Sequence, residues 1–200
     1  MKCPLMVSPS NHERPKDKEE EMMERIWRSV RGGGRAAPEE TADAVFSPIG
    51  VVRNAVKESQ MYGWESVESR IIVRRELTDA LDGLEGYSHV IVLFWIHRVP
   101  EEERGATRIR PMGDPTLPLL GVFATRTQLR PNPIGVSIVP LLARKGRELR
   151  VRGLDAIDGT PVLDVKPYIP HYDSVPQATI PAWASEVVGR RLHPLAEDLA

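Results

Sequence analysis

The chain has 200 residues, of which 41% are hydrophobic and 28% charged, and its net charge is −1. These values are typical of a globular domain that is large enough to bury a core. No apolar run approaches the roughly 18 residues of a membrane span, and the N-terminus lacks the apolar segment of a secretory signal. Cys3 is the only cysteine, which excludes an intrachain disulfide and a cysteine-based zinc site. We therefore expect a protein without a membrane span in a reducing, cytoplasmic setting.

Positive charge is concentrated in one part of the sequence. Residues 98–152 carry eleven Lys and Arg against five Asp and Glu, a local charge of +6, whereas residues 153–200 have a local charge of −4. A basic segment in a nearly neutral protein can form a face that meets a polyanion. A solvated charged surface has the same composition, so charge alone leaves both interpretations open.

Residues 1–44 differ in character from the rest of the chain. A segment with charges of both signs predicts a short amphipathic helix, because its apolar residues have helical spacing: Met22, Met23, Ile26, Trp27 and Val30. Gly32-Gly33-Gly34 then interrupts the pattern. No strand precedes these glycines and no Gly-Lys-Ser/Thr follows them, so we interpret residues 1–44 as a charged extension with a linker, not as a phosphate loop.

From residue 46 onward, short strands are predicted one after another. SPIGVVRNAV (47–56) and SRIIVRREL (69–77) are the first two, and the spacing of leucines within 76–87 favours a short helical segment. SHVIVLFWIHRV (88–99) follows, and it is apolar on both faces between Val90 and Ile96. That pattern is typical of a strand that is buried on both sides.

The second half of the chain continues the pattern. GVFAT (121–125) and GVSIVPLL (135–142) are predicted strands, and ELRVRGLDAI (148–157) with TPVLDVKPYI (160–169) predicts a hairpin around Asp158-Gly159. The tail at 181–200 has helical spacing. Closely spaced short strands with Gly and Pro between them predict a mostly-β fold. We expect a small β-barrel over residues 45–180, with peripheral helices at both termini.

An arginine- and proline-rich corner separates two of these strands. In TRTQLRPNPIG, Arg130 directly precedes Pro131-Asn132-Pro133, and Arg126 lies four residues before Arg130. Each proline fixes φ near −65° and lowers the entropy cost of holding the corner in one geometry. A separation of four residues across a turn lets both guanidinium groups face one pocket, to which Asn132 adds an amide. The alternative is a rigid connection with solvated arginines.

Acidic residues cluster in the segment that follows. Asp155 lies between apolar neighbours, where an ionised carboxylate needs a partner, and we interpret it as functional. Asp158 is explained by the predicted turn alone. Asp164, Lys166 and Tyr168 alternate with apolar residues and so share one face. That face fits a binding site and an outward surface equally well.

The histidines do not predict a metal site. His89 and His97 lie eight residues apart in a predicted strand, which places them roughly 26 Å from each other. That distance is too long for a shared metal ion. Either histidine can act as a base or ligand contact near a strand end, or simply cap a buried strand.

Three motifs in order resemble the TrmO family, also known as TsaA-like or YaeB-like: LEGYSHVIVLFWIH, GVFATRTQLRPNPIG and GLDAIDGTPVLDVKPYIP. The resemblance covers about residues 46–180. It implies a small β-barrel methyltransferase that uses S-adenosylmethionine without a Rossmann fold. It also implies a homodimer that methylates N6 of N6-threonylcarbamoyladenosine at position 37 of tRNA, with the basic segment 98–152 as the tRNA face.

The resemblance further implies a set of site residues. Those expected to bind the cofactor are Asn54, Ala55, Val56, Ser88, His89, Arg126, Gly153, Leu154 and Asp155. Contacts at 54–56 are expected mainly from the backbone, because the family's Ser-Pro-Tyr-like sequence is absent there. Those expected to bind the substrate are Arg130, Asn132, Lys166 and Tyr168. As a hypothesis, His89 or Asp155 is the catalytic residue that accepts the N6 proton, directly or through water.

Two alternatives stay open from the sequence. One is a non-catalytic barrel that binds S-adenosylmethionine or RNA, and the other is a methyltransferase that acts on a different acceptor. Methyl transfer to bulk tRNA distinguishes the first, and mass spectrometry of tRNA nucleosides distinguishes the second.

Overall fold

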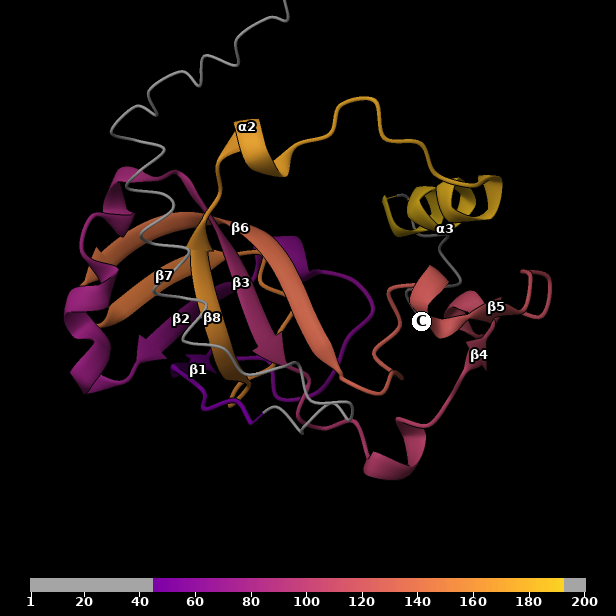
Figure 1. Ribbon diagram of the computed structural model, residues 1–200, viewed down its shortest axis with the longest axis horizontal. Coiled ribbons are helices and arrows are strands. Elements are labelled where there is room, and N and C mark those ends of the chain that lie inside the picture. The colour runs from indigo at the N-terminus through magenta and orange to yellow at the C-terminus, as the bar shows by residue number, and fades with distance from the viewer. Residues whose placement is uncertain (1–44, 193–200) are drawn as a thin grey trace, which may run out of the picture. The chain divides into compact units, whose positions relative to one another are not determined.

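The computed structural model describes residues 45–192 (Figure 1). Residue contacts separate Met1–Val45 from Phe46–Ala200, and the described strands and helices all belong to the second of these units. The predicted N-terminal helix and glycine linker, and residues 193–200 of the predicted helical tail, lie outside the described residues.

Six antiparallel strands close into a barrel in the order β1-β2-β7-β6-β3-β8 (Figure 1). Their bounds are β1 Gly50–Arg53, β2 Glu68–Val73, β3 His89–Trp95, β6 Ile134–Lys145, β7 Glu148–Arg152 and β8 Pro161–Pro167. Closure pairs the edges that an open sheet would leave exposed. The predicted mostly-β barrel is therefore confirmed.

Alternation along the strands builds the core. In β3, Val90, Val92 and Phe94 are at most 3% exposed, whereas the residues between them are half-buried. The prediction that this strand is fully buried on both sides is wrong, because a single layer of strands leaves the outer face of the barrel partly open to solvent. The buried cluster consists of Val52, Ile71, Val73, Leu81, Val90, Val92, Phe94, Val139, Leu149, Val151, Leu154, Ala156 and Val162.

Gly135 allows Phe94 to fill the interior of the barrel. The two residues lie opposite each other on β6 and β3. A Cβ on Gly135 would lie 2.3 Å from atoms of the Phe94 ring, a distance that no real contact allows. The missing side chain on β6 therefore makes room for the largest buried side chain of β3.

The predicted hairpin between residues 148–157 and 160–169 is wrong. β7 pairs with β2 and β6, whereas β8 pairs with β1 and β3. Gly153, at φ 82°, turns the chain away after β7, and Leu154 is fully buried. Asp158-Gly159 still forms a turn, with the Thr160 amide donating to Ile157 O at 3.2 Å. This turn delivers the chain to a different part of the barrel, because the 153–160 segment crosses between strands that are not neighbours.

The predicted strand at 121–125 is also wrong. Only Leu120–Gly121 is extended there, as β5, which pairs with β4 at Arg108–Ile109 in a separate two-stranded sheet. Val122–Ala124 forms a 3-10 turn, η6. The Val122 carbonyl, which a strand partner would need, accepts hydrogen bonds from the backbone and side chain of Thr125 at 3.1 and 2.8 Å.

Helical elements are short. The expected helical segment within 76–87 is confirmed as two 3-10 helices, η2 Arg75–Leu81 and η3 Leu84–Gly86. The others are η1 Trp64–Ser66, η4 Glu101–Glu103, η5 Pro111–Gly113, α2 Pro170–Asp173 and α3 Ala182–Leu192. Within residues 45–192, no helix is long and apolar enough to cross a membrane.

Candidate functional site

The first half of β6 has a paired strand on one edge only. β3 pairs with Ile134–Pro140, whereas β7 pairs with β6 only within Leu141–Lys145. Backbone and side-chain groups of the earlier residues are therefore accessible to segments other than strands.

Two of the predicted site residues meet this part of β6. Arg126 Nη2 donates a hydrogen bond to the Val136 carbonyl at 2.9 Å. The hydroxyl of Ser137, the next residue, donates a hydrogen bond to Asp155 Oδ1. Arg126 and Asp155 are both exposed. The structure thus brings a guanidinium from the proline corner and a carboxylate from the segment after β7 to neighbouring positions on one strand.

Arg130 turns toward the corner itself. Its Nη2 donates to the carbonyls of Thr125 at 2.8 Å and Val122 at 3.4 Å. Its Nε is buried and has no hydrogen-bond partner among the residues that the structure describes. Arg126 and Arg130 therefore have separate acceptors. Asn132 is exposed, and its carbonyl accepts from the Ile134 amide at 2.7 Å.

Gly153, Leu154 and Asp155, the three residues that follow β7, have different surroundings. The Gly153 amide donates to Val67 O at 2.9 Å, which fixes the turn. Leu154 is fully buried in the core, so any ligand contact at this position must come from its backbone. Asp155 is the residue of this segment whose side chain is exposed.

Asn54 holds the end of β1 against the same segment. Its Nδ2 donates to Ser69 Oγ at 2.9 Å and to the Ala156 carbonyl at 2.8 Å, and its Oδ1 accepts from the Val56 amide at 3.0 Å. Its own backbone amide donates to Asp158 Oδ1 at 3.1 Å. Both donors and the acceptor of the amide are occupied, so Asn54 positions residues 54–56 beside the 153–158 segment.

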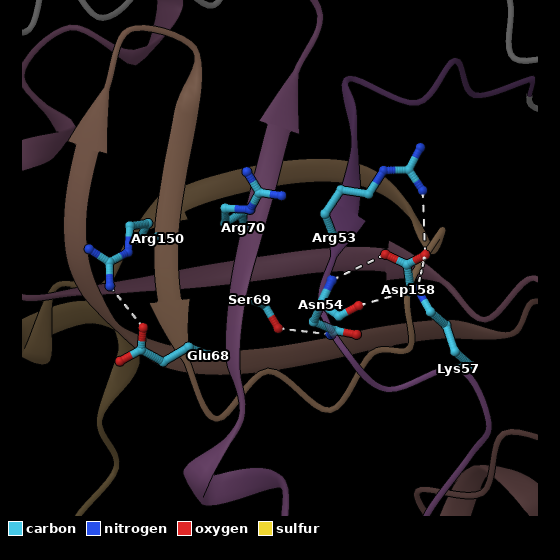
Figure 2. A pocket seen from close by; sticks show the side chains of 8 residues that line it. All are labelled: Arg53, Asn54, Lys57, Glu68, Ser69, Arg70, Arg150 and Asp158. Carbon is cyan, nitrogen blue, oxygen red and sulfur yellow. Dashed lines mark hydrogen bonds and ion pairs between the residues drawn. The ribbon is translucent and has the colours of Figure 1, made fainter.

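Asp158 does more than make a turn. It forms ion pairs with Lys57 at 2.8 Å and Arg53 at 3.6 Å (Figure 2). The hydrogen bond from Lys57, followed by the bond from the Asn54 amide and the positive charges of Lys57 and Arg53, lowers the pKa of this carboxyl, and partial desolvation opposes the shift. Sequence reasoning missed these contacts because they join residues about 100 positions apart.

Four predicted residues form a second group on the outer surface. The Ser88 hydroxyl lies 3.0 Å from His89 Nδ1, the rings of His89 and Tyr168 are 6.4 Å apart edge to face, and Lys166 pairs with Asp164 at 2.7 Å. His89 lies opposite Pro140, three residues along β6 from Ser137. That offset is roughly 10 Å at the usual strand rise.

The two candidate bases therefore occupy different places. Ser137 lies opposite the fully buried Val92 and shares its side of the sheet, whereas His89 alternates with the buried residues of β3 and shares the outer side. His89 and Ser137, the residue that holds Asp155, are therefore separated by three positions along the sheet and lie on opposite sides of it.

Three arginines of the basic segment 98–152 have different surroundings. Arg144 pairs with Asp82 at 2.6 Å and with Glu85 at 3.1 Å, and Arg147 donates to Val73 O at 2.9 Å. These arginines connect parts of the barrel. Arg150 instead lines a cavity of about 500 Å³ together with cations from β1 and β2 (Figure 2). Sequence reasoning missed this surface because its members meet only through strand pairing.

Residues 55–174 match the family model described as tRNA-methyltransferase O N-terminal domain. A relative from Methanothermobacter thermautotrophicus, a "probable S-adenosyl-L-methionine-binding protein", is 46% identical over 132 residues, which is 64% of this chain and 92% of that protein. The "tRNA (adenine(37)-N6)-methyltransferase" of Escherichia coli is 37% identical over 145 residues, 67% of this chain and 61% of that protein.

Solved structures agree with the sequence matches. The crystal structure of TrmO from Pseudomonas aeruginosa has a TM-score of 0.59 and 34% identity, over 72% of this chain and 63% of that chain. A second TrmO crystal structure has a TM-score of 0.56 and 36% identity. The chain therefore spans less than two thirds of the solved TrmO chains and of the E. coli enzyme. With a family model that matches more than half of its residues and a six-stranded barrel similar to those structures, this chain belongs to the TrmO family.

Proposed function

We propose that the chain transfers a methyl group from S-adenosylmethionine to tRNA, at N6 of N6-threonylcarbamoyladenosine at position 37. The observation that carries the proposal is the family match over residues 55–174. The E. coli relative named as a tRNA (adenine(37)-N6)-methyltransferase supports the enzymatic activity and the modified position. Relatives named as S-adenosyl-L-methionine-binding proteins support the cofactor. A tRNA acceptor is in turn consistent with a cytoplasmic setting.

The chemistry of Arg126 and Asp155 fits the cofactor. S-adenosylmethionine carries a carboxylate, an ammonium group and a sulfonium cation. A carboxylate such as Asp155 favours the positive groups, and an exposed guanidinium such as Arg126 can bind the carboxylate through two hydrogen bonds. The two side chains are held by neighbouring residues of β6. When bound, the cofactor supplies an electrophilic methyl group on sulfur.

Arg130 also fits a site for an anionic ligand. Its Nε is a buried donor without an acceptor among residues 45–192, and a buried donor destabilises the fold unless it has a hydrogen-bond acceptor. A carboxylate or phosphate oxygen near the corner would supply the acceptor. Because Arg130 already holds the corner in place through Thr125 and Val122, we assign it to substrate positioning next to Arg126.

The acceptor nitrogen must approach the methyl group in line, at about 3 to 3.5 Å, and lose a proton. We propose Asp155 as the acceptor of that proton, because it accepts from Ser137, which lies on the inner side of β6 and directly follows the residue that Arg126 contacts. His89, on the outer face with Tyr168, is then a contact for cofactor or tRNA. A water molecule can relay the proton where direct contact is not reached.

We further propose that two chains associate through the outer face of β6. Its side chains Val136, Ile138 and Leu142 are 41%, 52% and 36% exposed. Val136 and Ile138 lie opposite Leu93 and Ile91 of β3, so the apolar surface continues across two strands. Ile138→Lys is expected to yield a monomer in size-exclusion chromatography with light scattering. Val175→Lys, at a 68% exposed valine outside the barrel, should leave the dimer intact.

The decisive experiment incubates the full chain with radiolabelled S-adenosylmethionine and tRNA from a strain that lacks the gene, and then identifies the labelled nucleoside by mass spectrometry. Label in methylated N6-threonylcarbamoyladenosine supports the proposal. Cofactor binding without transfer supports a non-catalytic barrel, and label in another nucleoside identifies a different acceptor.

A further inference from the structure

Three arginines lie side by side on the outer face of three adjacent strands. Arg53 of β1 is opposite Arg70 of β2, and Arg70 is opposite Arg150 of β7. Figure 2 shows the side chains in the order Arg150, Arg70 and Arg53. We name these three residues the arginine row. Like charges directly opposite each other destabilise a sheet, and such departures from local rules are expected where a sequence serves a function.

The arginine row borders a cavity of about 500 Å³ with a positive balance of charge. Four cations and two carboxylates are among its lining residues: Arg53, Asn54, Lys57, Glu68, Ser69, Arg70, Arg150 and Asp158. The volume is within the range of ligand sites, but those are mostly apolar. None of these eight side chains is aromatic or aliphatic, so the cavity lacks the apolar walls that usually enclose an adenine ring. The positive balance also opposes a sulfonium cation, so the cavity fits an anion better than the cofactor.

Each arginine of the row has a carboxylate partner that an anion can replace. Arg53 pairs with Asp158 at 3.6 Å, Arg70 with Glu148 at 3.4 Å and Arg150 with Glu68 at 2.8 Å, and the three arginine side chains are 43 to 58% exposed. Exposed ion pairs of this kind contribute little to stability. A phosphate group accepts two parallel hydrogen bonds from a guanidinium, so exchanging a carboxylate for phosphate costs little.

The length of the row indicates more than one phosphate. Adjacent strands are about 4.8 Å apart, so the outer two arginines are separated by roughly 10 Å along the sheet. The outer two also turn to different carboxylates, Arg53 to Asp158 and Arg150 to Glu68, so their guanidinium groups do not converge on one point. A single phosphate group at one of them is therefore not in reach of the other as the side chains lie. A chain of phosphodiesters can reach both, and contacts of this kind supply affinity without reading sequence.

We infer that the arginine row binds the phosphate backbone of RNA, at a place separate from Arg126 and Asp155. The inference rests on the proposed function, which makes tRNA the RNA concerned. Arg53 and Arg70 lie outside the basic segment 98–152. Strand register, and not the local charge of the sequence, therefore defines this surface.

The test measures binding of bulk tRNA to the full chain by fluorescence anisotropy at several salt concentrations. Arg70→Ala should weaken binding about tenfold at low salt and reduce the slope of log K against log salt by about 0.7 to 0.9, as expected for one lost phosphate contact. Arg70→Lys, which retains the charge, should restore part of the affinity. The matched control is Arg74→Ala, because Arg74 directly follows β2, is 46% exposed and has one ion pair, with Glu76 at 3.3 Å. It should match the wild type.

Two further measurements separate this inference from the proposed function. S-adenosylmethionine affinity should be unchanged in Arg70→Ala, and a loss would place the cofactor in the cavity and overturn the inference. If Arg70→Ala binds tRNA with the affinity and salt slope of the wild type, the inference is overturned, even if the wild type methylates tRNA.

Methylation is measured separately. A wild type that binds tRNA through Arg70 without methylating it supports the inference and contradicts the proposed function. With AMP as the probe, an Arg70→Ala effect on AMP and none on tRNA identifies a mononucleotide site instead.

Discussion

Ser137 donates a hydrogen bond to Asp155, which joins the inner side of β6 to the segment that follows β7. We expect Asp155→Asn to lower methyl transfer by about 10² to 10⁴, the usual range for loss of a general base. The amide keeps the shape and can still accept from Ser137, so the melting temperature should not change. The measurement is single-turnover transfer to tRNA with cofactor saturating.

Ser137→Ala is the companion to that variant. It leaves the Asp155 carboxylate in place without its hydrogen bond, so the rate should fall less than in Asp155→Asn. His89→Ala should retain the pH dependence of the wild type. Full turnover in Asp155→Asn, together with loss of the pH dependence in His89→Ala, would assign the base to His89 instead.

Arg126→Ala should weaken S-adenosylmethionine binding about tenfold or more, because a hydrogen-bonded charge pair with the cofactor carboxylate is lost. Isothermal titration calorimetry measures the change. Arg108→Ala is a matched control, since Arg108 also donates one guanidinium hydrogen bond to a backbone carbonyl, Leu119 O at 3.3 Å, but lies on β4. An equal loss in both variants would indicate a general effect of removing an arginine.

Gly135→Ala should destabilise the barrel by about 1 to 3 kcal/mol, the usual cost of overpacking a core. The added Cβ meets the Phe94 ring at 2.3 Å, and Phe94 is buried on all sides. Gly86→Ala is the control, because nothing lies within 4 Å of the Cβ that it adds. Urea unfolding of both variants measures the difference, and equal midpoints would contradict the predicted clash.

Acid should weaken the contact between Asp158 and Lys57. That contact lowers the pKa of Asp158 below the ordinary aspartate value of 3.8. The unfolded chain keeps the ordinary value, so the stabilisation is complete above about pH 4 and is lost as the pH falls through the lower folded-state pKa. Asp158→Asn should therefore lose less stability than the wild type as the pH falls below about 4, as measured by the melting temperature at several pH values. Asp164→Asn, which removes the partner of Lys166 at 2.7 Å, is the control for the general effect of losing one exposed ion pair.

The barrel was predictable from sequence because its strands are marked locally. Alternating or continuous apolar runs predicted all six strands of the barrel, and no predicted end differs from the observed end by more than five residues. The prediction at 148–157 was the least accurate, because β7 ends at Arg152. The expectation that Arg126 and Asp155 share one pocket came from the prolines that fix the corner and from an acid among apolar residues, which requires a partner. In the structure, their hydrogen-bond partners are the adjacent residues Val136 and Ser137 of β6.

Pairing between distant strands was not predictable in the same way. Asp158-Gly159 predicts a turn, but a turn occurs both in a hairpin and in a segment that crosses to a distant strand. In the structure, the left-handed Gly153 and the buried Leu154 are the features that distinguish the crossing from a hairpin. The arginine row arises from the register of three strands, which one sequence does not reveal. The separation of His89 from Asp155 depends on which side of the sheet each residue faces.

The crossing from Gly153 to Thr160 connects the candidate site to the closure of the barrel. It leads from β7 to β8, the last strand along the chain, and β8 pairs with β1, the first. Asp155 lies within this crossing and accepts from Ser137 of β6, and the side chain of Asn54, which follows β1, donates to the Ala156 carbonyl. The proposed proton acceptor is therefore carried by the connection that joins the two ends of the barrel, so a change in the length of this connection should disturb the site and the barrel together.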